Sequence, residues 1–163
     1  MRVFRGHLHA VPTPTAVAIG NFDGVHLGHA ALLRQLVTAA TVRGLTPTVL
    51  TFEPHPREFF SPATAPARLS TLREKLELLA EQGVAQTMVC PFNHRFAALG
   101  AEDFVSVVLR DALRARYVVI GDDFRFGRGR DGDFALLQAM GAASGFEVAA
   151  MGSVLRFGGR VSS

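Results

Sequence analysis

The sequence predicts an α/β fold, in which a mostly parallel sheet carries helices on both faces. Short apolar runs rich in Val, Ile and Thr alternate with longer segments whose apolar residues have helical spacing. This alternation predicts parallel strands, because each helix returns the chain to the edge of the sheet where the strand began. At 163 residues the chain has the length of one domain, which buries enough surface to fold without disulfides. We therefore expect one doubly wound domain over residues 1–163.

Local signals delimit the expected elements in order. Gly44 and Gly83 stand where two helices need a left-handed residue to end. Thr71 and Glu74 form a capping box, in which each side chain accepts the backbone N–H of the other residue. The expected strands are 15–19, 46–52, 86–90, 117–120 and 147–154, and the expected helices are 27–43, 71–82, 101–114 and 133–143.

Residues 53–70 interrupt the alternation with a cluster of prolines, which helix interiors and central strands exclude. These prolines are Pro54, Pro56, Pro62 and Pro66. A loop this long in a compact domain is usually functional or disordered. Phe59 and Phe60 in its middle favour an ordered flap near a ligand, with a mobile surface excursion as the alternative.

Composition excludes several classes of function. No apolar run approaches the ~18 residues of a membrane span, and residues 1–7 lack the apolar centre of a secretory signal. Cys90 is the single cysteine, which excludes an internal disulfide and fits a reducing cytoplasm. Lys75 is the single lysine, and the many arginines suit anionic substrates or reflect genomic base composition. They form no dense stripe, so nucleic acid is not an expected partner.

Residues 20–29 carry the strongest functional pattern. They read Gly-Asn-Phe-Asp-Gly-Val-His-Leu-Gly-His and join the first expected strand to the first expected helix. Such a junction directs backbone N–H groups and the positive end of a helix dipole toward one point. His26 and His29 lie on one helix face and can reach the same anion. The pattern predicts a site for a phosphoryl group.

These ten residues resemble the G-x-F-D-G-x-H-x-G-H signature of the FMN adenylyltransferase family, the FAD synthetase half of bacterial riboflavin kinase/FAD synthetases. That family belongs to the Rossmann-like nucleotidyltransferases that share the H-x-G-H motif. Thr-Phe-Glu-Pro-His-Pro at 51–56 and Ile-Gly-Asp-Asp-Phe-Arg-Phe-Gly at 120–127 are similar to further family motifs, and the resemblance covers about residues 14–163. The three motifs follow the first, second and fourth expected strands, so they are expected at one edge of the sheet.

The resemblance implies transfer of AMP from ATP to FMN, with FAD and pyrophosphate as products and Mg²⁺ as cofactor. It implies that His26 and His29 are catalytic, because they would bind the ATP phosphates and stabilise charge on the α-phosphate. The residues implied in ATP binding are Gly20, Asn21, Phe22, Asp23, Gly24, Gly28, Gly121, Asp123, Ser162 and Ser163. Those implied in flavin binding are Pro54, His55, Pro56, Arg125, Phe126 and Arg128. No side chain is assigned as a metal ligand.

Some of these residues have alternative interpretations. Histidines three apart also occur in zinc sites, but no third ligand has suitable spacing here. Asp23 suits a helix cap as well as a contact with ribose or with water on magnesium, and His55 is either a phosphate contact or a solvated loop histidine. One of Phe124 and Phe126 is expected in the core. Residues 127–132 match G-x-G-x-x-G but follow the fourth strand, and no acid lies about twenty residues on, so they are not a dinucleotide fingerprint.

The end of the chain departs from the family pattern. The family continues with a Ser-Ser-Thr-x-x-Arg-like motif, whereas this chain stops after Ser162 and Ser163. We therefore expect a C-terminally truncated module that makes FAD faster when the downstream motif is restored, and a riboflavin kinase domain in the full-length protein. Two rival functions are a sister nucleotidyltransferase with another acceptor, such as a cytidylyl or pantetheine-phosphate transferase, and a non-catalytic flavin- or nucleotide-binding module.

Overall fold

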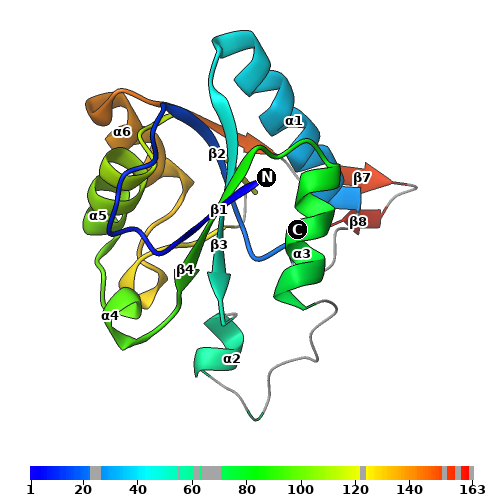
Figure 1. Ribbon diagram of the computed structural model, residues 1–163. Helices are drawn as coiled ribbons and strands as arrows, with labels where there is room; N and C mark the ends of the chain where they lie inside the picture. Colours follow the sequence, from blue (N-terminus) through cyan, green and yellow to red (C-terminus); the bar gives the residue numbers. More distant parts are fainter. Residues whose placement is uncertain are drawn as a thin grey trace.

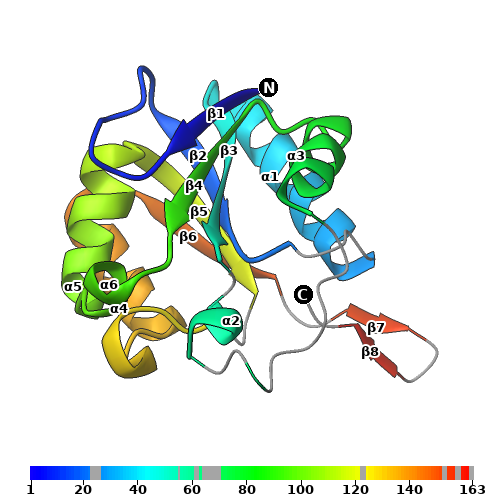
Figure 2. The same cartoon turned by 60° about the horizontal axis from the view of Figure 1, so that its bottom comes forward.

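A computed structural model confirms the α/β fold, with a six-stranded parallel sheet between two layers of helices (Figures 1 and 2). It describes residues 1–22, 27–54, 56–60, 63, 71–121, 124–151, 154–156 and 159–161. The strand order is β1-β4-β3-β2-β5-β6, and all neighbouring pairs are parallel. The strands are β1 (Arg2–Arg5), β2 (Thr15–Ile19), β3 (Thr46–Glu53), β4 (Gln86–Pro91), β5 (Ala115–Gly121) and β6 (Glu147–Met151).

The helices divide between the two faces of the sheet. One face is covered by α1 (Leu27–Arg43) and α3 (Leu72–Glu81), and the other by the continuous pair α5 (Ala101–Asp103) and π-helix η1 (Phe104–Ala112) together with α6 (Phe134–Ser144) (Figures 1 and 2). Shorter helices are α2 (Pro56–Phe60), α4 (His94–Ala97) and the 3₁₀ turn η2 (Arg128–Arg130). No helix in the described part of the chain is long and apolar enough to cross a membrane.

The central strand β2 explains why the core has two parts. All five of its residues are buried, as is typical of a parallel strand covered on both faces. Val17 and Ile19 belong to the cluster that includes η1, whereas Ala16 and Ala18 belong to the cluster that includes α1. Successive side chains of a strand point to opposite faces, so one short run contributes to both layers.

The local signals for helix ends are confirmed. Thr71 caps α3: its hydroxyl accepts the N–H of Glu74 at 3.1 Å, and the Glu74 carboxylate accepts the N–H of Thr71 at 3.0 Å. Gly44 has a φ of +67° and Gly83 has a φ of +94°, so both adopt the left-handed backbone that these ends require.

The structure differs from the sequence predictions at the last strand. The expected strand 147–154 was too long, since β6 ends at Met151, opposite the last residue of β5, Gly121. The chain instead forms an antiparallel hairpin from β7 (Val154–Arg156) and β8 (Gly159–Val161).

Other short elements were not predicted either. The edge strand β1 pairs only with β4, so tertiary pairing rather than its Arg-Val-Phe-Arg sequence creates it. Helix α4 has a single turn. Helix α2 lies within the expected loop 53–70 and begins at Pro56, the one helical position that readily accepts proline.

Candidate active site

The strand order brings the three sequence motifs to one edge of the sheet. They follow β2, β3 and β5, and β2 lies between the other two strands. The chain runs from β2 through β3 to β4 on one side, whereas β5 pairs with the opposite side of β2. The carboxyl end of β2 is therefore the point where the winding direction reverses, which is where open α/β sheets bind their ligands. This part of the prediction is confirmed.

The first motif begins with a compact turn. Gly20 donates its N–H to the Leu50 carbonyl at 3.1 Å, which ties the turn to β3. Phe22 has a φ of +53°, an uncommon conformation for an aromatic residue, and its side chain is fully buried. A Cβ at position 20 would lie 2.9 Å from Cε2 of Phe22. Glycine is thus required at position 20 because the Phe22 ring folds back over it.

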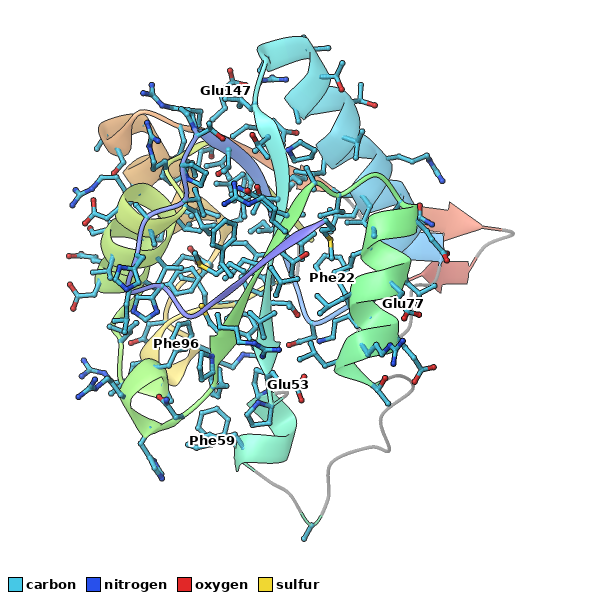
Figure 3. The ribbon with its side chains drawn as sticks, viewed as in Figure 1. Phe22, Glu53, Phe59, Glu77, Phe96 and Glu147 are labelled. Atoms are coloured by element: carbon cyan, nitrogen blue, oxygen red, sulfur yellow. The ribbon has the colours of Figure 1, made fainter. Side chains whose placement is uncertain are left out.

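Phe22 connects this turn to the predicted catalytic residue His29. The two rings pack with their centroids 5.0 Å apart and their planes at 52°. His29 lies in the first turn of α1 and is only 5% exposed. The Phe22 ring therefore restricts the orientation of the imidazole. Figure 3 shows Phe22 on the side of the sheet where α3 lies.

Asn21 presents an unsatisfied polar atom beside this turn. Its carbonyl accepts a hydrogen bond from Oγ1 of Thr51 at 3.1 Å. Its side-chain oxygen is buried and has no hydrogen-bond donor within the described structure. A buried acceptor without a donor costs about 1–3 kcal/mol, so this oxygen suits a hydrogen-bond donor of a bound ligand. Of the other first-motif predictions, Gly28 lies in the first turn of α1, whereas Asp23, Gly24 and His26 fall outside the described residues.

The second motif leads directly into α2, and an aromatic cluster anchors that helix. The Phe59 ring lies 5.5 Å from Phe92 and 4.9 Å from the imidazole of His94, both edge to face. The contacts hold the α2 region against the segment after β4, on the side of the molecule shown with Phe59 and Phe96 in Figure 3. Pro54 is exposed at the end of β3, and His55 falls outside the described residues. Phe59 of the expected flap thus packs against the protein, and the proximity of the flap to a ligand stays a prediction.

The third motif combines a core residue with exposed cations. Phe126 is buried against Phe104, at 5.3 Å, and the half-buried Phe124 stacks on it at 6.3 Å. Phe126 is therefore the expected core member of the pair. Arg125 and Arg128 are exposed, which leaves them accessible to an anionic ligand. Gly121 ends β5, and Asp123 falls outside the described residues, as do Ser162 and Ser163 near the C-terminus.

The glycines at 127–132 have a packing role. A Cβ on Gly127 would lie 2.7 Å from the Cα of Ala101, and the N–H of Arg128 bonds to the Leu99 carbonyl at 2.7 Å. Gly132 pairs with Phe126 in an isolated bridge, and a Cβ there would lie 2.5 Å from the Phe126 ring. These close approaches fully explain both glycines without a dinucleotide.

Comparison with known proteins agrees with this arrangement. A profile of the FAD synthetase family matches residues 8–163, nearly the whole chain. The chain belongs to the FAD synthetase family. It is 47% identical to the bifunctional riboflavin kinase/FMN adenylyltransferase of Escherichia coli (strain K12) over 166 residues, which is 100% of this chain and 53% of the relative. The enzyme of the same name from Haemophilus influenzae is 43% identical over 150 residues, 91% of this chain and 49% of the relative. The chain thus spans about half the length of these curated relatives.

Solved structures support the fold of this FAD synthetase family member. A crystal structure of a Streptococcus pneumoniae protein described as a macrolide-efflux protein superposes with a TM-score of 0.84 at 26% identity, covering 100% of this chain and 54% of the other. Pantothenate synthetase from Thermus thermophilus superposes with a TM-score of 0.56 at 17% identity, covering 99% of this chain and 66% of the other. The second likeness concerns the fold alone.

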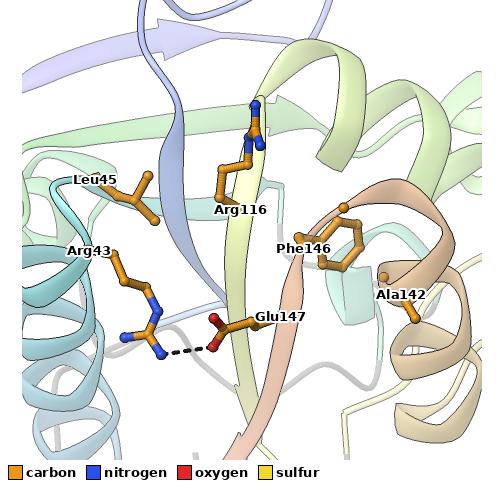
Figure 4. Close-up of a pocket in the computed structure, with 8 residues that line it drawn as sticks. Arg43, Leu45, Arg116, Ala142, Phe146 and Glu147 are labelled. Carbon is orange, nitrogen blue, oxygen red and sulfur yellow. Dashed lines mark hydrogen bonds and ion pairs between the residues drawn. The ribbon is translucent and has the colours of Figure 1, made fainter.

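A separate hollow of about 410 Å³ lies at the opposite edge of the sheet (Figure 4). Arg116 and Glu147 line it from the amino ends of β5 and β6. Arg43, at the end of α1, donates to Glu147 at 2.8 Å and lies over the Tyr117 ring at 4.6 Å. Since Arg43 is already engaged by these groups and the motifs lie at the other edge, this hollow is not the candidate active site.

Nucleophilic chemistry at the cysteine has little support in this chain. Burial raises the pKa of the Cys90 thiol to about 12, so the thiol is protonated at neutral pH and unsuited to nucleophilic attack. Within the described ranges, no group of three or more His, Cys, Asp and Glu side chains is arranged to hold a metal ion.

Sequence reasoning missed two contributors to the site. Thr51 lies inside the second motif but acts on the first, through its hydrogen bond to the Asn21 carbonyl. Lys75 in α3 donates in turn to Thr51 Oγ1 at 3.2 Å. The sequence pattern that could have indicated a buried Lys75 is its position four residues before Leu79. That spacing places both residues on the inner face of the helix.

Proposed function

We propose that this chain transfers AMP from ATP to FMN, forming FAD and releasing pyrophosphate. The observation that carries the proposal is the meeting of the three motifs at the ends of β3, β2 and β5, with His29 held against Phe22 beside the first of them. Membership of the FAD synthetase family supports it. The cytoplasm, where ATP and FMN are available, is the proposed location.

The reaction is a direct displacement at phosphorus. The FMN phosphate attacks the α-phosphorus of ATP, one P–O bond forms, and the bond to pyrophosphate breaks. The attacking group is already an anion, so no base has to remove a proton. The protein must align the two phosphates and offset their negative charge. The amino end of α1 contributes only about 0.3–1 kcal/mol to anion binding, or ~2 kcal/mol when partly buried. Imidazole donors from His26 and His29, together with magnesium, must therefore contribute the larger part.

Magnesium fits this scheme as a partner of ATP. In nucleotide sites Mg²⁺ usually keeps several waters and binds one or two carboxylates together with substrate phosphates. The side-chain oxygen of Asn21 is buried and has no donor among the described residues. It places a neutral oxygen in the turn of the first motif, and oxygen is the ligand type that Mg²⁺ prefers. Asp23, the acid of the first motif, would hold the ion through water. Bound there, Mg²⁺ would offset charge on the phosphates.

The remaining predicted contacts divide between the two substrates. We propose that the first-motif residues and Gly121, Asp123, Ser162 and Ser163 contact ATP. For the flavin side we propose Pro54, His55 and Pro56 together with Arg125 and Arg128, whereas the expected flavin contact Phe126 is buried in the core and supports this loop from within. The relatives are named as bifunctional and are about twice as long as this chain, so we assign a riboflavin kinase domain to the half that this chain does not span.

A His29→Ala variant tests the proposal. Loss of one preorganised donor lowers turnover by roughly 10²-fold or more, while FMN binding persists. The assay mixes α-labelled ATP with FMN and follows labelled FAD and pyrophosphate, with FMN binding measured by fluorescence quenching.

Parallel reactions with CTP, or with phosphopantetheine as acceptor, test the sister transferases. Wild-type turnover in His29→Ala, or a preference for another acceptor, would contradict the proposal. Bound flavin without pyrophosphate release would indicate a non-catalytic binding module.

A further inference from the structure

The single lysine of the chain is buried. Lys75 is 2% exposed and lies on the inner face of α3, in the layer of helices that also contains α1. Lysine is almost never fully buried unless its ammonium group is paired. Its Nζ donates to Oγ1 of Thr51 at 3.2 Å, near the end of β3. Neither residue has a role in the reaction proposed above.

The hydrogen bond from Lys75 determines the direction of a second one. An ammonium group has no lone pair and can only donate, whereas a hydroxyl has one proton and two acceptor sites. Because Thr51 accepts from Lys75, its own proton is available for the Asn21 carbonyl, which lies 3.1 Å away. Lys75, Thr51 and the Asn21 carbonyl therefore form a directed chain of hydrogen bonds. Its charged donor strengthens it in a buried, low-dielectric setting.

The chain ends at the most constrained backbone of the site. Asn21 lies between Gly20, which cannot carry a Cβ, and Phe22, whose φ is +53°. The Phe22 ring packs on His29 at 5.0 Å. Any shift of the Asn21 peptide moves the Phe22 backbone, and the Phe22 ring transmits that movement to the imidazole.

We propose that Lys75 is a positioning residue for the nucleotide site, acting through Thr51 on the Gly20–Phe22 turn. The inference rests on the proposed function, since it assigns the turn and His29 to ATP. Because Lys75 reaches the turn through Thr51, its effect is on the geometry of His29 and on ATP, not on the flavin side.

A second chain of the same form provides a matched control. Gln86 Nε2 donates to Thr48 Oγ1 at 3.0 Å, and Thr48 Oγ1 donates to the Thr46 carbonyl at 3.0 Å. Thr48 lies three residues before Thr51 on the same strand and is equally buried, but its chain ends at the start of β3, far along the strand from the turn. A Thr48→Val variant therefore removes a comparable buried hydrogen bond without touching the site.

The experiment compares Thr51→Val, Thr51→Ser, Lys75→Met and Thr48→Val with the wild-type chain. We expect Thr51→Val and Lys75→Met to lower kcat/KM for ATP by roughly tenfold to a hundredfold, with KM for FMN unchanged. Thr51→Ser keeps the hydroxyl and restores the wild-type value. The double variant Lys75→Met with Thr51→Val loses less than the sum of the two single variants, since both substitutions break the same chain of hydrogen bonds. Thermal unfolding, measured in parallel, reports stability.

A spectroscopic measurement keeps the test independent of activity. Solution NMR follows the Phe22 backbone amide and the His29 ring protons, which lie in the ring current of Phe22. Both signals shift in Thr51→Val and Lys75→Met and stay in place in Thr51→Ser and Thr48→Val. If Lys75→Met does not fold, the two Thr51 variants decide the matter. Absence of FAD synthesis even from a chain extended through the downstream motif would refute the proposed function, while the NMR shifts would still test the positioning role. Unmoved signals and unchanged kinetics in Thr51→Val, or equal effects of Thr48→Val, would overturn the inference.

Discussion

Phe22 determines the local geometry of the candidate site. Its left-handed backbone costs about 1–3 kcal/mol, and such conformations persist only when the surroundings hold them. Here the Phe22 side chain is fully buried. Its ring lies over Gly20, which has no side chain, and packs against the ring of His29. Gly20, Phe22 and His29 thus pack as one unit. The spacing of the motif is therefore required by packing as well as by the chemistry of its side chains.

A Gly20→Ala substitution tests this packing unit. The new Cβ would lie 2.9 Å from Cε2 of Phe22, so the ring must move and His29 must move with it. We expect kcat for FAD synthesis to fall roughly tenfold to a hundredfold, because small misplacements of catalytic groups have effects of this size. Gly100→Ala, where no atom lies within 4 Å of the new Cβ, is the control and keeps the wild-type rate. Equal rates in the two variants would show that the Phe22 ring does not orient His29.

At the scale of elements, short-range chemistry sets helix ends, and long-range packing sets the loops. The capping box of α3 involves only residues 71–74 and is fully encoded there. The loop after β5, in contrast, is shaped by contacts with α5, which lies earlier in the chain and is packed against Gly127. These two cases lead to different predictions.

The cap of α3 makes a measurable contribution to stability. A Thr71→Ala substitution removes the hydroxyl that accepts the N–H of Glu74, and we expect it to cost about 0.5–2 kcal/mol in the free energy of unfolding. Hydrogen bonds from the backbone N–H and the side chain of Thr71 lower the pKa of Glu74, so the contribution of the Glu74 carboxylate is present above the ordinary glutamate pKa and is lost as pH falls through the lowered value. Urea unfolding of Thr71→Ala and Thr71→Ser at neutral and acidic pH measures both effects. A cost as large in Thr71→Ser would refute the hydroxyl as the cause.

The glycines after β5 are predicted to matter for folding and not for nucleotide binding. Gly127 and Gly6 both have a φ of +80°, but only at Gly127 would a Cβ meet the backbone of Ala101, at 2.7 Å. We expect Gly127→Ala to destabilise the fold by roughly 1–3 kcal/mol more than Gly6→Ala, because overpacking is added to the same backbone strain. The ATP affinity of the folded fraction stays at the wild-type value in both. Loss of ATP binding in Gly127→Ala without loss of stability would restore the dinucleotide interpretation of residues 127–132.

At the scale of the whole molecule, the order of the strands separates two edges with different properties. The carboxyl edge gathers the three motifs, and the amino edge holds the hollow around the Arg43–Glu147 ion pair. That pair is largely solvent-exposed and contributes little to stability. The N-terminal segment joins the edge strand to the rest: Gly6 donates to the Val89 carbonyl at 2.8 Å, and the His7 ring packs on Phe96 at 5.7 Å.

The packing of His7 makes the stability of the molecule depend on pH. Burial lowers the pKa of His7 below its ordinary 6.5, so the unfolded chain binds this proton more tightly than the folded protein. The stabilisation is therefore complete above pH 6.5 and is lost as pH falls below it. His7→Phe keeps an aromatic ring beside Phe96 and removes this part of the pH dependence, as measured by urea unfolding between about pH 5 and 8. His9→Phe, at an exposed position, is the control. Identical pH profiles in wild type and His7→Phe would contradict the prediction.

Most of the architecture follows from patterns that lie close together in the sequence. The alternation of strands and helices, the ends of α1 and α3, and the position of the motifs after strands depend on local apolar spacing, capping residues and glycines. These signals act over a few residues, so they can be recognised in the sequence without knowledge of the fold. The helical turn α2 was not predicted because the four prolines of residues 53–70 indicate a loop. One of them, Pro56, stands at the first position of the helix, where proline favours a helix start.

The tertiary structure decided what depends on partners distant in the chain. The strand β1 exists through pairing with β4, and β6 ends at Met151, opposite the last residue of β5. In the same way, the strand order brings Lys75 and Thr51 within hydrogen-bonding reach of each other and of the Asn21 turn. No local pattern in the sequence encodes that order. The sequence alone thus determined which residues have the chemistry to bind phosphates, because residue types and short spacings carry that information. Only the fold determined how they are held, because hydrogen bonds and ring contacts between separate elements require all of them to be in place at once.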